Sequence, residues 1–573
     1  MEASVEDKRS NDSSADKKNA SSVNNNVLDL PSDANAKTNR ARFWIIMVAL
    51  MLAFVISSLD GAVVSTALPT IVHEFNIGAS YVWVVNIYFL ATAAVQPLLG
   101  QLSNLWGRRW IFISVVALFL LGSGLIGGAT SSAMIIAGRG VQGLGAGGIN
   151  MMVPLIISDL TPLRERSKYI GLMFAVSSVV SAAGPVISGA LASGDEWRWI
   201  WYLNLPIGGL CLAMSIIWLR LSRSPDNKSF MQQVYSIDWV GAILIAASAV
   251  AILWAIAYGG STKPWSDGTI IAPLVLGHFG LALFVVWQKL PQCRNPITPL
   301  RLFTNRTSAV AYFLGFSNTL VIYWPAFMLP LFFQSVHGMS PEQSGIQLLP
   351  FIFFFPVGSA FGGMMMAKTG RYKPFHLAGF ALCTLSFGLC SILNRNSSKA
   401  TYVIFEIIAA LGIGIPVPCL LPAVQAPLKD TDAAVSTATF AFLRSFGAIW
   451  GLAIPAAVFN NRFSQLLYTI EDESVRASLA NGKAYELASA ALLARFPDVT
   501  RNQVLAVYTE SLKQTWQVAI AFAGFSFLVA LCEKEIPLRQ KLETDYGMEN
   551  ETNKAGSGDR PLKPGNDTKE ESL

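Results

Sequence analysis

Long apolar runs separated by short polar loops make up most of this chain. Fourteen runs approach or exceed the roughly 20 apolar residues that a helix needs to cross a bilayer, so the pattern predicts an all-α polytopic membrane protein. We expect the membrane spans at residues 44–67, 81–101, 111–129, 133–157, 169–192, 200–220, 238–259, 269–288, 307–335, 345–367, 375–393, 401–426, 436–459 and 516–532.

The composition agrees with a membrane protein. Hydrophobic residues make up 53% of the chain and charged residues 14%, whereas charged residues approach about 25% in soluble proteins. The net charge of +6 comes from Lys and Arg spread over short loops, which indicates membrane orientation rather than nucleic-acid binding. Most of the six cysteines lie in apolar spans, so we expect no disulfide framework. Residues 1–43 and 533–573 are rich in polar residues, and we expect two disordered tails.

The charges of the loops predict the orientation of the chain. Lys and Arg concentrate in the short loops on the side of the N-terminus, and cytoplasmic loops carry such an excess. We therefore expect both termini in the cytoplasm. Residues 460–515 then form a long outer loop, in which runs such as Tyr485–Arg495 could be short amphipathic helices. Asn396 begins a glycosylation sequon in a predicted outer loop.

The loops after the second and tenth spans share one glycine spacing. Gly100 precedes Gly107 by seven residues, and Gly363 precedes Gly370 by the same number. Weak internal symmetry of this kind is typical of transporters built from two six-helix halves around a substrate site at the midplane. We therefore expect an N-terminal half at residues 44–220, two inserted helices with linker loops at 221–306 and a C-terminal half at 307–532.

Four charged residues lie well inside predicted spans: Asp60, Arg139, Glu406 and Arg444. An ionisable side chain at the centre of a membrane helix costs roughly 2.5–3.5 kcal/mol on insertion scales, so its presence is a hypothesis of function. Few buried charges in a large apolar body suggest a transport pathway.

One polar stripe runs along the fourth span. Arg139, Gln142 and Asn150 lie at offsets of 0, +3 and +11 on one helix face, and such a stripe should face the bundle interior or a water-filled cavity. Asp60 lies at a depth similar to that of Arg139, so the two could pair. We expect Asp60 to bind and release a proton as its distance from Arg139 changes. The alternative is a static ion pair that only fixes helix packing.

Further residues of the spans are candidates for proton or substrate binding. Glu406 lies about as deep in its span as Arg139 does in the repeat partner, and an ordinary interfacial carboxylate is the alternative. Arg444 is expected to line the cavity, because a lipid-exposed guanidinium would lack partners. A cavity for a flat or greasy organic molecule would add Gln142, Asn150, Tyr323 and Trp324 to Arg444, although each aromatic side chain could instead face lipid.

Several strings carry a family resemblance. The first three are Gly100-Gln-Leu-Ser-Asn-Leu-Trp-Gly107-Arg108-Arg109, Arg139-Gly-Val-Gln142-Gly143-Leu-Gly145 and Gly184-Pro185-Val-Ile-Ser-Gly189. They resemble the loop 2–3 signature, the span-four signature and the span-five antiporter signature of the major facilitator superfamily. Two further strings resemble the 14-span drug:proton antiporter branch of this superfamily, especially its fungal toxin and multidrug efflux members. They are Leu59-Asp60…Ala67-Leu68-Pro69 and Trp197-Arg198-Trp199…Asn204-Leu205-Pro206.

The resemblance covers roughly residues 44–535. It implies a major facilitator fold and a cytoplasmic gate built from Gly100, Asn104, Gly107, Arg108 and Arg109. An acidic residue usually stands where this chain has Asn104, so the usual Asp–Arg contact cannot form there, although Asp159 or Glu165 could substitute.

The span-five motif has a physical interpretation of its own. Pro185 removes a backbone donor and bends its helix, and Gly184 and Gly189 allow neighbouring helices to approach closely. A flexible seam between helices suits alternating access, and ordinary glycine-rich membrane packing is the alternative.

The motifs of enzymes and ATP-driven pumps are missing from the sequence. Residues 143–148 fit G-x-G-x-x-G but follow no strand, and the sequence contains no phosphate-binding loop, H-E-x-x-H or paired C-x-x-C. We therefore expect no enzymatic activity, no catalytic or metal site and no cofactor. The family resemblance implies the proton gradient as the energy source.

The sequence thus predicts a proton-coupled antiporter that exports amphipathic small organic molecules, such as a fungal toxin, another secondary metabolite or drugs. We expect a functional monomer in the plasma membrane, with the vacuolar membrane as the alternative. Its partners would be a small-molecule substrate, protons and the lipid bilayer, and no nucleic acid. The competing functions are a vacuolar transporter of basic amino acids and a non-transporting membrane sensor on the same fold.

Overall fold

The computed structural model describes residues 33–75, 81–193, 196–221, 229–259, 263–480, 484 and 496–540. Within these ranges every regular element is a helix, apart from one isolated bridge between Gly259 and Lys263. The chain divides after Ile45 into two units, and the second unit holds every described helix except the start of α1.

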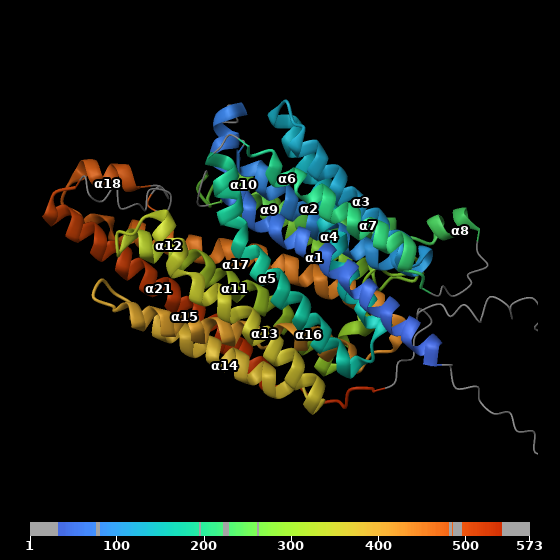
Figure 1. Cartoon of the computed structure of the whole chain (residues 1–573). Helices are drawn as coiled ribbons and strands as arrows, with labels where there is room; N and C mark the ends of the chain where they lie inside the picture. Colours follow the sequence, from blue (N-terminus) through green and yellow to red (C-terminus); the bar gives the residue numbers. More distant parts are fainter. Residues whose placement is uncertain are drawn as a thin grey trace, which may run out of the picture. The chain divides into compact units, whose positions relative to one another are not determined.

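Figure 1 labels most of the helices along the chain. The helices before residue 221 are α1 (Asp33–Phe75), α2 (Tyr81–Trp106), α3 (Arg108–Gly127), α4 (Ser132–Leu160), α5 (Leu163–Ser193), α6 (Trp199–Tyr202) and α7 (Asn204–Trp218). The middle of the chain forms α8 (Phe230–Tyr235), α9 (Trp239–Tyr258), α10 (Gly268–Trp287) and the 3-10 helix η2 (Leu300–Phe303). The remainder forms α11 (Arg306–Ser335), α12 (Pro341–Gln347), α13 (Leu349–Thr369), α14 (Lys373–Cys390), α15 (Lys399–Gly414), α16 (Val417–Gln425), η3 (Asp430–Asp432), α17 (Ala433–Leu466), η4 (Leu467–Thr469), α18 (Glu473–Leu479) and α21 (Asp498–Leu531).

The predicted all-α membrane class is confirmed. Among the described residues, twelve helical segments are long and apolar enough to cross a membrane. The predicted spans 169–192 and 375–393 correspond to α5 and α14, which are helical but do not belong to these twelve. The structure is compatible with fourteen spans, and that number stays a prediction.

Two glycines with positive φ end equivalent helices of the two predicted halves. Gly107 has a φ of 85° and separates α2 from α3, while Gly370 has a φ of 70° and ends α13 before α14. Glycine adopts such a backbone without the steric cost that other residues meet. The spacing that the two loops share in the sequence therefore ends, in both loops, at a glycine with positive φ, although ψ differs between them (158° at Gly107 and 14° at Gly370).

The first glycine of each spacing lies at a close helix crossing. Gly100 of α2 packs against Ala434 and Ala438 of α17, and Gly363 of α13 packs against Ser167 of α5. A Cβ atom at either glycine would collide with the facing helix. The two crossings join α2 to α17 and α5 to α13, so each connects the first predicted half to the second.

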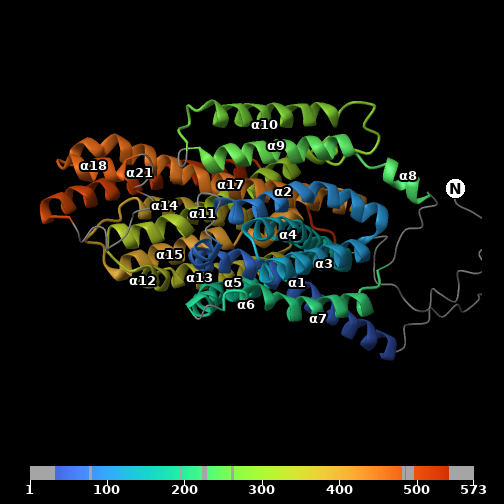
Figure 2. The ribbon, with the colours of Figure 1, turned by 90° about the horizontal axis from the view of Figure 1, so that it is seen from above.

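The inserted helices α9 and α10 run side by side along one edge of the helical body (Figure 2). α10 packs on α9, and α9 packs on α2 and α17. The pair therefore lies outside the crossing of α2 and α17, where it leaves the interior of the two halves free. Asp238 caps the start of α9 and accepts hydrogen bonds from Gly241 N, Trp287 Nε1 and Gln288 Nε2.

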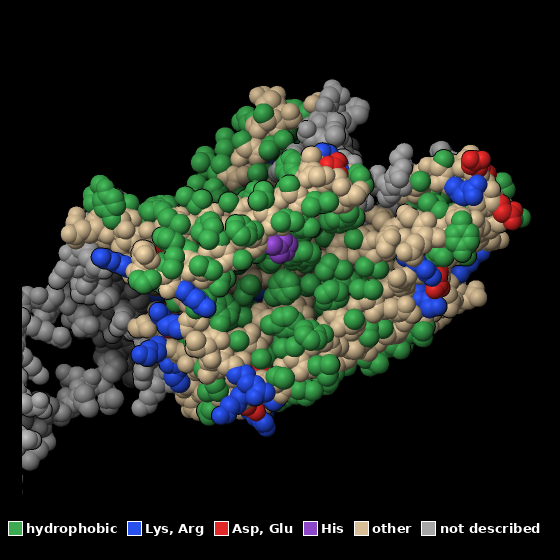
Figure 3. Space-filling model, turned by 180° about the vertical axis from the view of Figure 1, so that it is seen from behind, with side chains coloured by type: hydrophobic (Ala, Val, Ile, Leu, Met, Phe, Trp, Pro, Cys, Tyr) green, Lys and Arg blue, Asp and Glu red, His purple; other side chains and the backbone are tan. Residues whose placement is uncertain are grey.

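Large apolar side chains cover much of the exterior. Figure 3 shows hydrophobic side chains across the middle of one face, with Lys and Arg gathered toward its ends. On α10, Val275, Leu276 and Phe279 are each more than half exposed. Contiguous apolar surface of this extent marks contact with a membrane or a partner, and on helices of this length it fits the acyl chains of a bilayer.

The segment predicted as a long outer loop is partly helical, which corrects the expected boundaries. α17 continues to Leu466, and α21 begins at Asp498 rather than near residue 516. The reason is tertiary packing: Phe463 of α17 contacts Tyr508 of α21 inside a hydrophobic cluster, and α18 contributes Val475 to the same cluster. The run Tyr485–Arg495 lies outside the described residues.

The structure describes the part of each predicted tail that adjoins a membrane helix, residues 33–43 and 533–540. α1 starts at Asp33, before the predicted span, because residues 33–43 include good helix formers such as Ala, Lys and Arg. After α21, residues 533–540 pack on the start of α14. His376 Nδ1 lies 2.8 Å from the carboxylate of Glu533, with both side chains fully buried, and the hydroxyl of Tyr372 donates to the carbonyl of Lys534.

Candidate functional site

Asp60 of α1 and Arg139 of α4 form a buried ion pair. Arg139 Nη1 donates to Asp60 Oδ2 at 2.5 Å, and neither side chain is more than 1% exposed. Arg139 Nε also donates to the carbonyl of Val84 on α2 at 3.0 Å. The structure thus brings together two residues whose similar depths in separate spans had suggested a pair.

Gln142 completes a ring of hydrogen bonds around this pair. Its Oε1 accepts from Arg139 Nη1 at 2.7 Å, and its Nε2 donates to Asp60 Oδ1 at 2.8 Å and to Ser123 Oγ at 2.9 Å. The side chains in the ring are buried, and a buried charge is tolerated only with such partners. Protonation of Asp60 would therefore leave the guanidinium of Arg139 without its counter-charge and destabilise this arrangement.

Tyr88 lies between the ion pair and a cavity. Its ring centroid is 4.1 Å from Arg139 Cζ, a distance at which the cation and the aromatic face attract each other. Its hydroxyl donates to the carbonyl of Ser57 at 3.4 Å. Tyr88 and Ser57 both line the cavity, so Tyr88 contacts both the cavity and the buried guanidinium.

The cavity has a volume of about 310 Å³ and lies between the two predicted halves. Its walls come from α1, α2, α4 and α5 on one side and from α11 and α17 on the other. Small-molecule sites in proteins have volumes of about 300–1,000 Å³, so this cavity is at the small end of that range. Its aromatic lining consists of Phe54, Tyr88, Phe89, Phe174, Tyr323 and Phe440.

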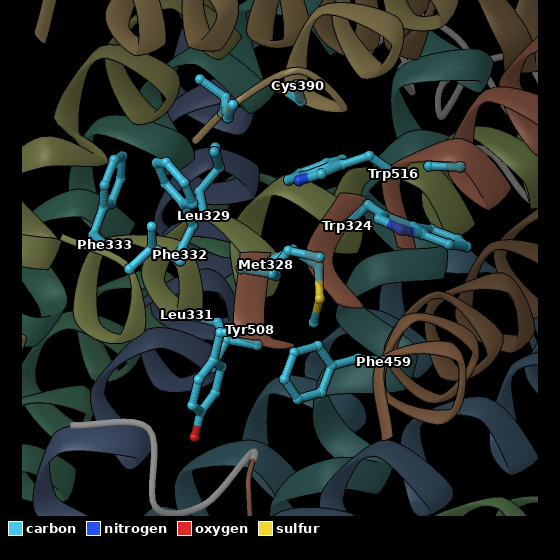
Figure 4. Close-up of a cluster of buried hydrophobic side chains, with 14 of the residues drawn as sticks. Trp324, Met328, Leu329, Leu331, Phe332, Phe333, Cys390, Phe459, Tyr508 and Trp516 are labelled. Atoms are coloured by element: carbon cyan, nitrogen blue, oxygen red, sulfur yellow. The ribbon is translucent and has the colours of Figure 1, made fainter. Parts of the chain in front are cut away.

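Three of the predicted cavity residues line this space and two do not. Asn150, Tyr323 and Arg444 are in the lining, whereas Gln142 belongs to the ring around the ion pair. Trp324 lies in a hydrophobic cluster (Figure 4), where its indole Nε1 donates to the carbonyl of Thr515. Successive residues of a helix point about 100° apart, and here Tyr323 faces the cavity while Trp324 points into the hydrophobic cluster.

Arg444 extends into the cavity from α17. Its Nε donates to Thr319 Oγ1 at 3.2 Å, and its guanidinium carbon lies 5.1 Å from the ring of Phe174 and 5.8 Å from the ring of Phe440. Among the described residues, no carboxylate forms an ion pair with it. The partners of Arg444 are thus hydroxyl and aromatic groups.

A hydrogen bond across the cavity joins the two halves. Ser445 Oγ of α17 donates to Gln96 Oε1 of α2 at 3.0 Å, and both residues line the cavity. Neither residue was among the candidates from the sequence. The available signal was an amide side chain in the middle of an otherwise apolar span.

Glu406 is buried in α15 away from the cavity lining. It has no accessible surface, and within the described part of the chain neither carboxylate oxygen has a hydrogen-bond partner of acceptable geometry. A charge at this position would be uncompensated, and burying such a charge is costly. The structure therefore places Glu406 apart from both the Asp60–Arg139 pair and the cavity.

Arg108 carries the polar contacts of the loop between α2 and α3. Its Nε donates to Asp159 Oδ2 of α4 at 2.9 Å, and its Nη1 donates to Asn104 Oδ1 at 3.0 Å. Of the two acidic residues that could replace the missing family carboxylate, the structure brings Asp159 to Arg108. Arg109 instead donates to the carbonyl of Ile216 at the end of α7.

Hydrogen bonds join the two halves at the end that is predicted to be cytoplasmic. Arg164 donates to the carbonyls of Ala367 and Lys368 on α13 at 2.9 and 2.7 Å. Arg166 Nη1 donates to Gln425 Oε1 of α16 at 2.8 Å, and burial lowers the pKa of this arginine to about 10, so it stays protonated near neutral pH. These contacts were not found from the sequence, because a basic loop residue predicts orientation but not its partner.

Two remaining sets of predicted residues have simple placements. Gly184, Pro185 and Gly189 all lie within α5, and the side-chain surroundings of Pro185 and Gly189 lie outside the described residues. Asn396 is exposed in the turn between α14 and α15, as a modified asparagine would need to be.

Comparison with known proteins decides the family. A sequence model of the Major Facilitator Superfamily matches residues 50–452, which is more than half of the chain and includes the ion pair and the cavity. The chain belongs to the major facilitator superfamily. It is therefore a transporter by family, with a small-molecule substrate and a membrane setting.

Several fungal transporters of this superfamily are similar over nearly their whole length. The MFS-type transporter gkaD of Penicillium citrinum is 43% identical over 93% of this chain and 91% of its own length. The MFS efflux transporter aclA of Aspergillus oryzae is 42% identical over 92% and 95%, and the MFS-type efflux pump LUC4 of a Fusarium species is 40% identical over 90% and 92%. This transporter is thus of the fungal efflux type.

Solved structures support the fold alone. The human organic anion transporter MFSD10 aligns with a TM-score of 0.53 at 13% identity, over 85% of this chain and 99% of its own. The proton:xylose symporter XylE aligns with a TM-score of 0.50 at 14% identity, over 84% and 95%.

Proposed function

We propose that this transporter exports amphipathic small organic molecules in exchange for protons, by alternating access of the cavity to the two sides of the membrane. The observation that carries the proposal is the buried Asp60–Arg139 pair, which Tyr88 links to the cavity between the halves. An ionisable pair inside a membrane bundle is the usual mark of a proton relay or substrate pathway.

The coupling follows from the charges of the pair. With Asp60 ionised, the ring through Gln142 is complete and the predicted cytoplasmic end is closed. A proton that reaches Asp60 from the outside removes the counter-charge of Arg139, so the ring loses its stabilising ion pair. We propose that this loss favours opening toward the cytoplasm, where cargo enters the cavity and the proton leaves.

Glu406 is a second candidate for proton binding. Its buried carboxyl group has no ion-pair partner among the described residues, and an ionisable residue inside a membrane bundle is a candidate for a proton pathway. Its position away from the cavity fits a proton site better than a site for cationic cargo.

The setting of the transporter is part of the same proposal. We place it in the plasma membrane as a functional monomer. We place both termini in the cytoplasm, because its short loops carry Lys and Arg on the side of the N-terminus. The proton gradient supplies the energy. Against transport of basic amino acids, the lining of the cavity contains Arg444 and no acidic residue among those described.

Export from a pump-deficient yeast strain tests the proposal. Cells that express the transporter should extrude some members of a panel of toxins and dyes, and a protonophore should abolish this extrusion. Asp60→Asn should stop export while the protein remains at the cell surface. Glu74→Gln, on the same helix but in an exposed pair with Arg198, is the matched control and should export normally. Normal export by Asp60→Asn, or export that persists with the protonophore, would refute the coupling.

A further inference from the structure

The charge inside the cavity is unbalanced. Arg444 is the one charged residue among those that line it, and the rest of the described lining is aromatic, aliphatic, amide or hydroxyl. The neighbouring guanidinium of Arg139 is buried against Asp60. Arg139 thus has a carboxylate partner within the protein, whereas Arg444 has none among the described residues.

The surroundings of Arg444 leave room for an external partner. Its Nε is held by Thr319 Oγ1 at 3.2 Å, and the rings of Phe174 and Phe440 lie within 6 Å of its guanidinium carbon. These contacts fix the plane of the guanidinium, and its charge remains unneutralised by any described acidic residue. A guanidinium presents a rigid fork of donors that matches a carboxylate or another planar anion.

We propose that the cavity binds a singly charged organic anion, such as a carboxylate or an enolate, and that its acidic group pairs with Arg444. This inference rests on the proposed export function and narrows its cargo. The flat or apolar body of the cargo would lie against Phe54, Phe89 and Tyr323, and its neutral polar groups would meet Gln96 and Asn150. A cationic cargo would meet Arg444 with no acidic residue of the lining to offset the repulsion.

The size and charge of the site limit the cargo further. A cavity of about 310 Å³ holds one compact ring system with a short acidic arm, and a polyanion would exceed the single positive charge. Because a charge-assisted hydrogen bond to an ionised group is worth roughly 1.5–3 kcal/mol, we expect the anion to bind at least about tenfold more tightly than its neutral ester.

The test compares three probes that share one aromatic body. These are 2-naphthyloxyacetate, its methyl ester and 2-(2-naphthyloxy)ethyl-trimethylammonium, titrated against the purified full chain in lipid nanodiscs. The wild-type transporter should bind the carboxylate at least about tenfold more tightly than the ester, and the cation most weakly. Equal binding of carboxylate and ester, or tighter binding of the cation, overturns the proposal.

Variants show whether Arg444 is the cause. Arg444→Gln should remove the preference for the carboxylate while it keeps binding of the ester, and Arg444→Lys should keep part of the preference. Arg462→Gln, the same substitution on the same helix at a half-buried position outside the cavity lining, should change neither. Retained ester binding shows that Arg444→Gln is folded, and a preference that survives in this variant contradicts the assignment.

The outcome separates this inference from the export function. Export from yeast without any charge preference in the binding assay refutes the anion site and leaves the function standing. A charge preference without export supports the anion site and refutes the function.

Discussion

A double-mutant cycle at Asp60 and Arg139 distinguishes a proton carrier from a static ion pair. The pair is fully buried and its closest atoms are 2.5 Å apart. Removing one partner of a buried pair costs roughly 3–5 kcal/mol of stability. Asparagine keeps an acceptor for Gln142, so we expect Asp60→Asn to cost about 3 kcal/mol. Arg139→Gln should cost a similar amount, because it leaves the carboxylate uncompensated.

The double variant should recover much of this loss, because it leaves no buried charge unpaired. We expect a coupling of roughly 2–3 kcal/mol from unfolding titrations in mixed micelles. Export should nevertheless be absent from the double variant, since no carboxylate remains to carry the proton. Glu74→Gln, in the exposed pair with Arg198, should cost less than about 1 kcal/mol.

Two results would refute this reasoning. Additive costs of the two single changes would mean that the pair does not interact as the geometry requires. A double variant that is stable and exports as the wild type does would mean that the pair only fixes helix packing.

Three other predictions follow from the contacts outside the pair. Gly363→Val should hinder the close approach of α13 to Ser167. It should therefore raise the accessibility of cavity residues to a thiol reagent from the predicted cytoplasmic side, and unchanged labelling would contradict the proposal that this end is closed. Arg164→Ala should act in the same direction because it removes two hydrogen bonds to α13, whereas the exposed Lys168→Ala should not. Burial desolvates Asp238, yet hydrogen bonds to its carboxylate lower its pKa. The ionised Asp238 should therefore stabilise the α9–α10 hairpin at a pH above the ordinary carboxyl pKa of about 3.9, and this stabilisation should be lost as the pH falls through the lowered pKa. Asp238→Asn should remove that pH dependence in thermal unfolding, and an unchanged profile would contradict it.

The sequence was sufficient for the fold class and for the central ion pair. A membrane helix rises by about 1.5 Å per residue, so the position of a charge within a span gives its depth, and matching depths predicted that Asp60 and Arg139 could meet. The shared spacing of Gly100–Gly107 and Gly363–Gly370 likewise predicted related loops, because each pair combines a close helix crossing with a glycine of positive φ.

What depth cannot give is the rotation of each helix about its axis. Tyr323 and Trp324 have the same depth, yet only Tyr323 faces the cavity. Tyr88 stood among several aromatic residues of the spans, and its place over Arg139 depends on how α2 packs on α4. Depth also does not predict contacts between segments that are distant in the sequence, such as the buried pair of His376 and Glu533.

The most direct test of the account is proton movement driven by cargo in liposomes that contain only this transporter and a pH-sensitive dye. With a compound that the yeast assay shows to be exported, a cargo gradient should drive protons in the opposite direction through the wild-type protein and should drive none through Asp60→Asn reconstituted at equal density. Cargo flux without proton movement, or the same proton movement in Asp60→Asn, would contradict the central claim.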